Sequence, residues 1–555
     1  MQSTKFITAM FLATLAFAGA RARCQANITE SQNPAIYVDS EKGSDAALNA
    51  MTTMSANAAL AKINSVGTSV APLQTIQSAI NLATLKNQLN VGAKIIVNPG
   101  VYRESLNIGA SQTAAPLTIE AATTGTTYIS GSDAISGGWS AQSGGVYSHA
   151  WTYNFGTCPT PSGWPSMSTL ARRTEMVFVN GNSLTQVLSS SSLSPGKFYV
   201  NESSNQLLIK PPVNTNMSTA SVEVATRSQI LSISGRSNVV VRGMVIEHAR
   251  SCVNQNAAVI SNSSGVLVDN VQAVWNNWGG LEISNSNNIT VQNSVGSHNG
   301  GVGFHGYQDT NSLWENNKTD YNNWRGAEGG LLDWGMGGFK SMLMHTATVL
   351  NHHSYGNQAQ GLWFDTDNKN ITINGVYLSN NELADLQLEA SEGPITVENS
   401  HLCNSRAGVE LLNAAKVTFK SNTFYNNGTS GQQYDAQIFL GGRSGGHVIR
   451  DWQSGAYYNI YTNDTVMTGN VVVDSNSGQH VFGTYLSSGA FYDFKSTLNA
   501  GSNRWYDPHT TSAFELVNGS KVSFSGWKSA MGTDYSSSWG APSSSPAGAC
   551  AIAAQ

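Results

Sequence analysis

The sequence is poor in charge. Asp, Glu, Lys and Arg make up 11% of its 555 residues, against about a quarter in ordinary soluble proteins, and the net charge is −5. Without a basic region the chain offers nothing to hold the phosphate backbone of a nucleic acid, so we expect no nucleic-acid partner. The apolar share of 40% also excludes the charged, apolar-poor composition of a disordered protein.

Proline and cysteine are also scarce, with 14 and 5 residues, whereas glycine is abundant with 54. The cysteines are too scattered for the framework of a small disulfide-rich domain. We expect single buried thiols for most of them, with one or two disulfides as the alternative. No Cys and His have the spacing of a metal site, and phosphate-loop and HExxH motifs are absent, so no cofactor is expected. The cysteines are Cys24, Cys158, Cys252, Cys403 and Cys550.

Long hydrophobic runs are absent as well. The apolar run Phe6–Ala18 follows Lys5 and is too short to span a bilayer. Ala18-Gly19-Ala20 fits the small-residue pattern of a cleavage site. The sequence therefore predicts a signal peptide over residues 1–20, no membrane span, and a secreted protein, extracellular or periplasmic.

The chain contains an internal repeat. The repeated segment has five residues: a mainly apolar three-residue stretch and then a polar pair. It recurs at steps of 22 to 27 residues, with one step of 35. No helical pattern lies between these segments, and Asn, Gly and Ser separate them, so each repeat predicts one coil of a parallel β-helix. The segments are Val239–Gly243, Val266–Asn270, Ile289–Asn293, Ser312–Asn316, Ala347–Asn351, Ile371–Gly375, Ile395–Asn399 and Val417–Ser421.

A second set of short segments repeats between the first. In it, apolar side chains at every second position are expected to point inward, and those between them outward. This set predicts a second parallel sheet of the same solenoid. Its segments are Gly280–Ser284, Gly301–His305, Gly361–Asp365, Asp385–Glu389 and Gly408–Leu412.

The rest of the chain divides around these coils. Pro72–Leu85 has the pattern of an amphipathic helix that caps an open solenoid end. Phe178–Gly181 and Lys197–Val200 read as antiparallel hairpins in an inserted segment. We therefore expect an N-terminal cap with the first coils over 35–145, an inserted β-rich segment over 146–228, coils over 229–500, and a decorated C-terminal segment with a Ser-rich tail over 501–555.

One outward column of the second sheet is polar. Alignment of the second set places His305, Lys340, Asp365 and Glu389 in this column, and counting from the other side would place Glu328 where Lys340 stands. Carboxylates on adjacent strands would lie roughly 5 Å apart, which is the separation found in retaining glycosidases. So close a pair pushes the two pKa values apart and gives one acid and one anion at neutral pH.

A neighbouring column carries Glu282, Trp363, Gln387 and Glu410, which could hold a sugar ring. Nearby turns carry aromatic and cationic side chains that are expected to wall a cleft. These are Trp324, Arg325, Trp334 and Tyr355, the third on a loop over residues 326–337.

Simpler interpretations of these residues stay open. Asp365 and Asp367 could form an Asx turn that ends a strand, and Glu389 could be a solvated strand residue. Asp365, Asp367 and Glu389 together could bind Ca²⁺. Lys340 could serve only to neutralise Asp365, and His305 could be a hydrogen-bonding partner without a catalytic role.

Three segments carry a resemblance to a family. Tyr37–Asp39, Asn98–Glu104 and Ile129–Asp133 resemble the secreted right-handed parallel β-helix proteins with a pectate-lyase-like fold. The resemblance covers most of the chain and implies an all-β fold, a single-stranded right-handed parallel β-helix. This fold hosts lyases, hydrolases, epimerases and adhesins, so it implies no particular substrate.

Gly361–Asp365, followed one coil later by Gln387–Ser391, is similar to the Asp-then-Glu arrangement of some β-helical glycoside hydrolases. That similarity implies Asp365 as nucleophile and Glu389 as acid/base. The family's polysaccharide lyases use a Lys or Arg base with Ca²⁺ or Arg on the uronate, and Lys340 and Arg325 would take those parts here. A dense cluster of Ca²⁺-binding Asp residues is missing, which favours the hydrolase.

The leading hypothesis is therefore a secreted glycosidase acting on a polysaccharide or oligosaccharide. A polysaccharide lyase with Lys340 as base is the first alternative, and a non-catalytic carbohydrate-binding or surface protein is the second. We expect a monomer, because a capped solenoid leaves no open sheet edge to pair.

Overall fold

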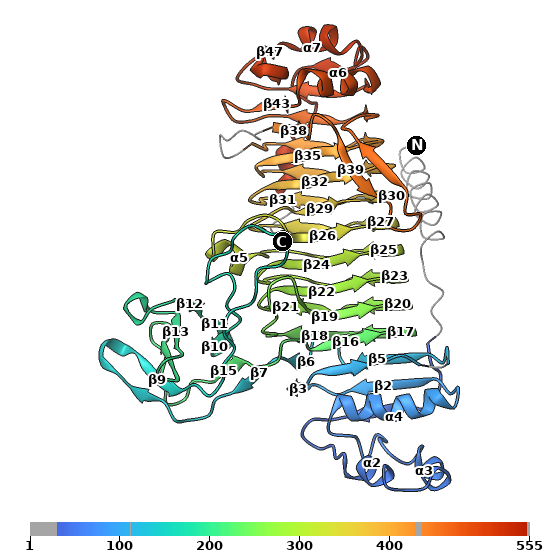
Figure 1. Cartoon of the computed structure of the whole chain (residues 1–555), viewed down its shortest axis with the longest axis vertical. Helices are drawn as coiled ribbons and strands as arrows, with labels where there is room; N and C mark the ends of the chain where they lie inside the picture. The colour runs from blue at the N-terminus through green and yellow to red at the C-terminus, as the bar shows by residue number, and fades with distance from the viewer. Residues whose placement is uncertain (1–29, 112, 429–435, 552–555) are drawn as a thin grey trace, which may run out of the picture.

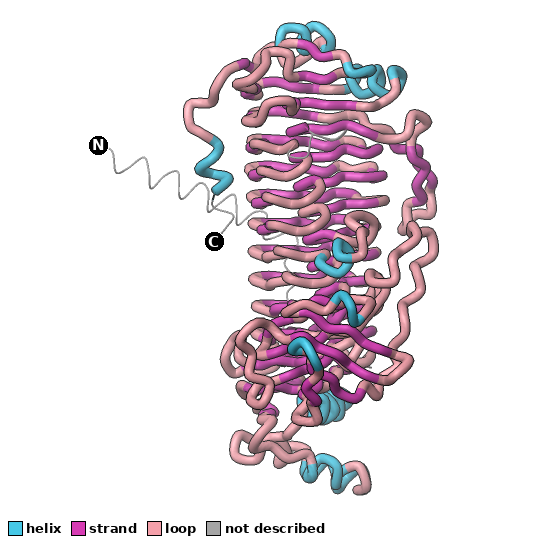
Figure 2. Tube along the Cα trace, turned by 90° about the vertical axis from the view of Figure 1, so that its left-hand side faces the viewer, coloured by secondary structure: helices cyan, strands magenta, loops and turns pink. Residues whose placement is uncertain are grey.

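Stacked β-strand coils form the body of the protein (Figure 1). The computed structural model describes residues 30–111, 113–428 and 436–551. The predicted signal peptide over residues 1–20 and Cys24 lie outside the described residues. Seen from the side, the strands of successive coils form regular parallel rungs along the long axis (Figure 2).

A complete coil contributes one strand to each of three sheets. In one coil, β19 (Asn256–Ser261) lies in sheet 2, β20 (Ser264–Asp269) in sheet 1 and β21 (Gln272–Val274) in sheet 3. β22 (Gly279–Ser284) then returns to sheet 2 and pairs in parallel with β19. The predicted all-β fold, a parallel β-helix, is confirmed.

Sheet 1 has thirteen strands. They are β1 (Ile36–Val38), β2 (Ala93–Val97), β5 (Leu117–Ala121), β17 (Ser237–Arg242), β20, β23 (Asn287–Gln292), β25 (Thr310–Glu315), β27 (His345–Leu350), β30 (Lys369–Asn374), β33 (Ile395–Glu398), β36 (Val417–Lys420), β41 (Val466–Thr468) and β44 (Asn499–Gly501). The first set of repeats in the sequence falls in this sheet.

Sheet 2 also has thirteen strands, the last one antiparallel to its neighbour. They are β4 (Leu106–Ile108), β16 (Leu231–Ser234), β19, β22, β24 (Val302–Tyr307), β26 (Gly337–Met342), β29 (Leu362–Asp365), β32 (Ala384–Ser391), β35 (Ala407–Ala414), β38 (Ala436–Gly441), β43 (His480–Thr484), β46 (Phe514–Glu515) and β47 (Lys521–Val522). The second set of repeats falls here.

Sheet 3 consists of two runs joined by single bridges at Val295 and Lys318. The first run is β3 (Gly100–Tyr102), β6 (Thr127–Ser130), β18 (Met244–Glu247) and β21. The second is β28 (His353–Tyr355), β31 (Tyr377–Ser379), β34 (His401–Cys403), β37 (Thr423–Tyr425), β42 (Val471–Val473), β45 (Arg504–Tyr506) and β48 (Ser538–Trp539).

The core is a stack of identical inward positions. In sheet 2, for example, Phe304, Phe339, Leu362 and Leu386 are paired along the sheet and are all buried. Because side chains alternate across a strand, the residue next to each of these points outward. The regular core thus fixes which side chains reach the surface of the sheet.

Asparagine is frequent because it forms the corners. Asn270, Asn293 and Asn316 follow successive strands of sheet 1 with φ values of 53°, 51° and 55°. Asparagine tolerates this left-handed conformation better than other residues that carry a side chain. At another corner, the side chain of Asn299 donates to Asn322 Oδ1 at 3.2 Å, in a buried stack. The composition of the sequence therefore reflects the turns of the coil.

The predicted capping helix is present as α4 (Ile76–Gln88). Its N-cap, Thr75, accepts a hydrogen bond from Ser78 N, and Ile76 and Ile80 are buried in the main core. This end also carries α2 (Ala46–Met51) and α3 (Ala56–Lys62), and the other end α6 (Ser488–Thr497) and α7 (Phe524–Met531). None of the helices in the described residues combines the length and the apolar character needed to cross a membrane.

The inserted segment forms two small sheets with a core of their own, which project from the solenoid (Figure 1). It leaves after β6 and returns before β16, and its strands run from residue 132 to residue 225, beginning earlier than the expected 146. One sheet holds β7 (Ser132–Ala134), β10 (Val177–Val179), β11 (Asn182–Ser183) and β15 (Val222–Ala225). The other holds β8 (Ser140–Ala141), β9 (Tyr147–Ala150), β12 (Thr185–Gln186), β13 (Lys197–Asn201) and β14 (Gln206–Lys210).

Two disulfides join distant segments of the chain, so the expectation of single thiols for most cysteines is wrong. Cys158 of the insert pairs with Cys252, and Cys403 in β34 pairs with Cys550 in α8 (Pro546–Cys550). The second bond attaches the C-terminal segment to sheet 3. Partners 94 and 147 residues apart leave no pattern in the sequence.

A hairpin interrupts the corner between sheets 2 and 1. It consists of β39 (His447–Arg450) and β40 (Tyr457–Ile460) and follows β38. In Figure 1 it folds back along the solenoid toward β27 and β30. Its tip contacts His345 and Asp367 of those earlier coils, so one corner of the helix carries an added wall.

Candidate active site

Two carboxylates face each other on the outward side of sheet 2. Asp365 ends β29, and Glu389 in β32 is its direct partner in the parallel ladder. Their neighbours Phe364 and Leu388 are fully buried, which turns both carboxylates away from the core. Adjacent strands lie about 4.8 Å apart, so the two groups are close enough to act on one bond.

The two carboxylates do not have the same environment. Burial, together with the negative charge of Asp365, raises the pKa of Glu389 to about 7. Gln387 donates to Glu389 Oε2 at 2.8 Å, and Gln360 donates to Gln387 Oε1 at 2.8 Å. Glu389 is therefore held in one orientation and can carry a proton near neutral pH.

Lys340 in β26 provides the positive charge of the site. Its Nζ lies 3.1 Å from Asp365 Oδ2 and donates to the backbone oxygen of Trp334. The same nitrogen lies 3.2 Å from the centre of the Trp363 ring. Thr366 donates to Asp365 Oδ1 at 2.8 Å, so both oxygens of this carboxylate have a partner. Asp365 is thereby held in one orientation.

Two hollows flank the carboxylate pair. One, with a volume of about 350 Å³, has Asp365, Lys340 and His305 at its base and Trp164 and Trp334 at its walls. The other, of about 340 Å³, lies toward the C-terminal coils. Its lining includes Asp333, Gln360, Gln387, Arg406, Glu410 and Tyr485. A chain-like ligand could therefore cross the carboxylates and extend to both sides.

The aromatic wall of the first hollow comes from two distant segments. Trp334 is 44% exposed, and its ring centre lies 6.4 Å from that of Trp164 in the insert. The Cys158–Cys252 disulfide attaches the Trp164 loop to the solenoid, within a small apolar cluster of its own. The insert is thus part of the cleft.

The predicted column is partly wrong. Lys340 pairs with His305 as expected, and Asp365 with Glu389. However, Lys340 pairs with Trp363, and Asp365 pairs with Met342, so the two pairs stand in adjacent columns, two residues apart. A shift of two residues leaves every side chain on the same face, so alternation in the sequence cannot reveal it.

The other column therefore reads Glu282, His305, Lys340, Trp363 and Gln387. Burial raises the pKa of Glu282, but the nearby His305, 3.7 Å away, and the hydrogen bond that Asn256 donates to Oε2 at 2.7 Å lower it overall. Trp363 is only 4% exposed and lies beneath Lys340. It supports the lysine and presents no open face to a sugar.

Arg325 does not lie in the cleft. It is in α5 (Trp324–Glu328), is 1% exposed, and donates to Asn277 Oδ1 at 3.0 Å, Gln186 Oε1 at 2.9 Å and the backbone oxygen of Glu175 at 2.7 Å. These partners belong to the solenoid and the insert. Arg325 therefore holds the two parts together, and its predicted contact with substrate is wrong.

Asp367 is also turned away from the carboxylate pair. It is fully buried, accepts a hydrogen bond from Trp452 N at 2.9 Å, and lies 3.3 Å from His345 Nε2. The turn after Asp365 has one residue more than the turn after Met342, and this change places Asp367 beneath the hairpin. In the described residues, Asp367 lies with His345 and Asp451. It does not lie with Asp365 and Glu389, with which it was expected to bind Ca²⁺.

Comparison with known proteins agrees with this architecture. Residues 256–527 match a family model described as a right-handed β-helix region. The fold is therefore a right-handed parallel β-helix. No curated protein matches this β-helix chain.

Solved structures resemble this β-helix at low sequence identity. The structure of XylC in complex with xylose is 14% identical in sequence to this chain. The match has a TM-score of 0.63 and covers 87% of this chain and 85% of the XylC chain. The A-module of the mannuronan C-5 epimerase AlgE6 from Azotobacter vinelandii is 16% identical, with a TM-score of 0.49 over 84% and 94%. At 14% identity, the likeness to XylC is one of fold.

Sequence reasoning missed three side chains of the β-helix cleft. Trp164, Gln360 and Arg406 line the hollows or support Glu389, yet none lies in a repeated outward position of sheet 2. Gln360 directly precedes Gly361 of the second repeat set, and this placement was a usable signal. Trp164 comes from the insert and had no such signal.

Proposed function

We propose that this β-helix protein is a secreted glycoside hydrolase that cleaves glycosidic bonds with retention of configuration. Asp365 serves as nucleophile and Glu389 as acid/base. The observation that supports this assignment is the direct pairing of the two carboxylates across adjacent strands, together with the raised pKa of Glu389. Retaining enzymes need their carboxyl groups about 5 Å apart, which is close to the strand spacing.

In the first step, the Asp365 carboxylate attacks the anomeric carbon while protonated Glu389 gives its proton to the departing oxygen. In the second step, Glu389 as carboxylate takes a proton from water, and that water displaces Asp365. Gln387 donates to Oε2 of Glu389 and so leaves Oε1 to carry the proton. The ammonium group of Lys340, 3.1 Å from Asp365 Oδ2, orients the nucleophile.

The contacts of Lys340 favour the hydrolase over the lyase. A lysine base must be neutral when it removes a proton from the sugar. Here the ammonium group contacts Asp365 and the backbone oxygen of Trp334 and lies over the Trp363 ring. With all three contacts made, the nitrogen is not free to take a proton from a sugar.

The substrate class is a polysaccharide or oligosaccharide, because hollows extend to both sides of the carboxylates. Xylosides belong in the first panel of substrates, since a structure of the same fold was solved with xylose. Two disulfides support a place outside the cytoplasm, where oxidising conditions preserve them.

The test is a panel of polysaccharides and aryl glycosides incubated with purified protein. New reducing ends, the anomeric configuration of the first product, and the ultraviolet absorbance of unsaturated uronides would be recorded. We expect reducing ends with retained configuration, absent in Asp365→Asn and Glu389→Gln. Glu398→Gln, a matched change on sheet 1 away from the cleft, should keep the activity.

Other outcomes overturn the proposal. Unsaturated products that persist in both carboxylate variants and disappear in Lys340→Ala would identify a lyase. Binding of glycans without any product, equal in wild type and variants, would identify a carbohydrate-binding or surface protein.

A further inference from the structure

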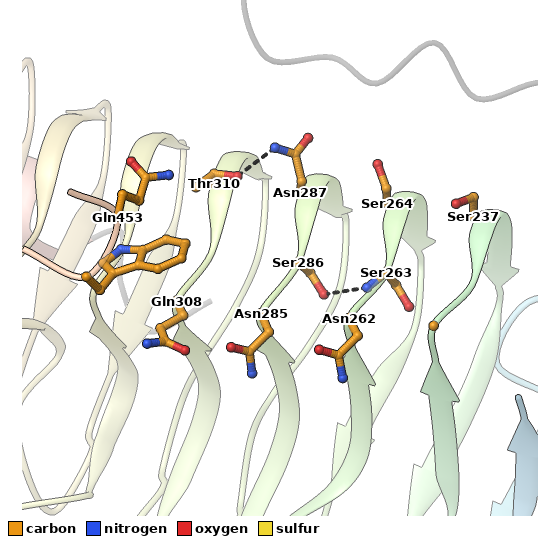
Figure 3. A pocket seen from close by; sticks show the side chains of 12 residues that line it. Ser237, Asn262, Ser263, Ser264, Asn285, Ser286, Asn287, Gln308, Thr310 and Gln453 are labelled. Carbon is orange, nitrogen blue, oxygen red and sulfur yellow. Dashed lines mark hydrogen bonds between the residues drawn. The ribbon is translucent and has the colours of Figure 1, made fainter. Parts of the chain in front are cut away.

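A third hollow, of about 470 Å³, lies at the corner where sheet 2 turns into sheet 1 (Figure 3). It shares no lining residue with the two hollows at the carboxylates. Its lining consists of one glycine and of hydroxyl, amide and indole side chains, which come from four successive coils and the hairpin. None of the lining residues is charged. We call this hollow the corner groove.

The first row of the corner groove consists of amides that lack partners. Asn262, Asn285 and Gln308 lie on successive coils with φ values of 49°, 48° and 52°, and their side chains lie parallel to one another (Figure 3). Within the described residues, none of these three amides makes a side-chain hydrogen bond. At another corner the equivalent amides do pair: Asn316 donates to Asn293 Oδ1 at 3.3 Å. The free amides therefore are not a requirement of coil stacking.

The second row of the corner groove is in strict register. Ser237, Ser264, Asn287 and Thr310 are partners along sheet 1. Neighbouring strands lie about 4.8 Å apart, so the four side chains offer polar groups along about 14 Å. Asn287 donates to Thr310 Oγ1 at 2.7 Å, which orients both groups. The result is an evenly spaced line of donors and acceptors.

The hairpin closes one end of the corner groove with Trp452 and Gln453. Trp452 N donates to Asp367 Oδ2 at 2.9 Å, and Gln453 Oε1 lies 2.8 Å from His345 Nδ1. Asp451, the preceding residue, is in contact with Lys369. The backbone of Trp452 and the amide of Gln453 are therefore held in place before any ligand arrives, and the indole of Trp452 packs against the His345 ring at 5.4 Å.

We propose that the corner groove binds one strand of an uncharged polysaccharide along the axis of the helix. A glycan repeats hydroxyl groups at regular intervals, and the two polar rows repeat their donors and acceptors once per coil. Trp452 provides apolar area for the face of a sugar ring. A polyuronate is disfavoured, because no cation of the lining would compensate its carboxylates. The site would hold polymer beside the cleft, and it does not depend on the proposed hydrolysis.

The test measures binding without turnover. Glu389→Gln protein is run through native gels that contain hydroxyethylcellulose, arabinoxylan or galactomannan, and in parallel through gels with alginate or polygalacturonate. We expect retardation by at least one neutral polymer and not by the polyuronates. Replacement of Asn262, Asn285 and Gln308 by glycine removes the amides and suits the left-handed backbone. Each lost hydrogen bond should weaken binding about 2- to 10-fold, so this triple variant and Trp452→Ala should each reduce the retardation clearly.

Two controls separate the corner groove from the cleft and from misfolding. Asn316→Gly, at a φ of 55° on another corner, should bind as the parent does. Trp334→Ala, in the cleft, should reduce the retardation less than either groove variant does. The proposal is overturned if no neutral polymer retards the protein, if only polyuronates do, or if Trp334→Ala abolishes retardation while the groove variants keep it. Loss of hydrolysis with retained binding would instead concern the proposed function alone.

Discussion

The ammonium group of Lys340 lies 3.1 Å from Asp365 Oδ2 although the two residues are not paired along the sheet. Lys340 pairs with Trp363, lies over its ring, and reaches across to the neighbouring column. This diagonal contact brings one cation to the pair of carboxylates. The charge balance of the site therefore depends on a side chain that spans two columns.

Replacement of Lys340 by methionine should change both rate and pH dependence. The positive charge of Lys340 lowers the pKa of Glu389, so its removal should raise that pKa further and move the alkaline limb of kcat/KM to higher pH. Loss of one charged contact to the nucleophile should reduce kcat/KM about 10- to 100-fold. Lys340→Arg keeps the charge and should keep the limb in place. An unmoved alkaline limb in Lys340→Met would contradict this coupling.

The raised pKa of Glu389 predicts the pH profile of the wild type. Activity requires Glu389 protonated, so kcat/KM should fall as pH rises through about 7. Glu389→Gln should lower kcat about 100- to 10,000-fold on substrates that need acid assistance. Aryl glycosides with acidic leaving groups should be affected least, because their oxygen departs without a proton. Equal losses on all leaving groups would argue against the acid role.

The same group makes stability depend on pH. The folded protein keeps the Glu389 proton up to about pH 7, whereas an unfolded glutamate releases it near 4.5, its ordinary pKa. The contribution is therefore largest at low pH and is lost as pH rises through about 7. The Tm of Glu389→Gln minus the Tm of wild type should therefore be larger at pH 8 than at pH 5. The measurement is thermal unfolding of both proteins at the two pH values.

Much of the fold could be predicted from the sequence because each coil repeats the same local requirements. Apolar positions such as Val266 and Ile289 recur at the same point of each coil, and left-handed asparagines such as Asn293 end the strands. Register along the stack was less accessible. The sequence alignment placed Lys340 and Asp365 in one column, an error of two residues. A shift of two residues keeps every inward side chain inward, so the apolar pattern could not reveal the error.

Contacts between distant segments could not be predicted. Arg325 looked like a cleft cation because Trp324 and Trp334 are near it in sequence, yet its partners Gln186 and Glu175 lie in the insert. Likewise Asp367 resembles a calcium ligand in its local sequence, and only the hairpin at Trp452 explains its burial. In both cases the partner lies at least 85 residues away.

Arg325 and Trp334 should separate stability from substrate binding. Arg325→Met removes three buried hydrogen bonds and leaves their acceptors unsatisfied, which should lower the free energy of unfolding by about 3 kcal/mol or more. The KM of the folded protein should stay near that of wild type. Trp334→Ala, at an exposed wall, should raise KM and cost about 1 kcal/mol or less. Denaturant unfolding and steady-state kinetics on both variants check this, and the reverse pattern would restore Arg325 to the cleft.

The two disulfides should have different effects on the cleft. Each closes a long loop, of 94 and 147 residues, and removal of either should destabilise the protein by about 3 to 4 kcal/mol. Cys252→Ala also frees the segment that presents Trp164 to Trp334, so KM should rise. Cys550→Ala frees α8 from sheet 3, on a different face of the solenoid, and should leave KM unchanged. Kinetics below the unfolding temperature of both variants measure the difference. Equal KM values would mean that the insert shapes the cleft without help from its disulfide.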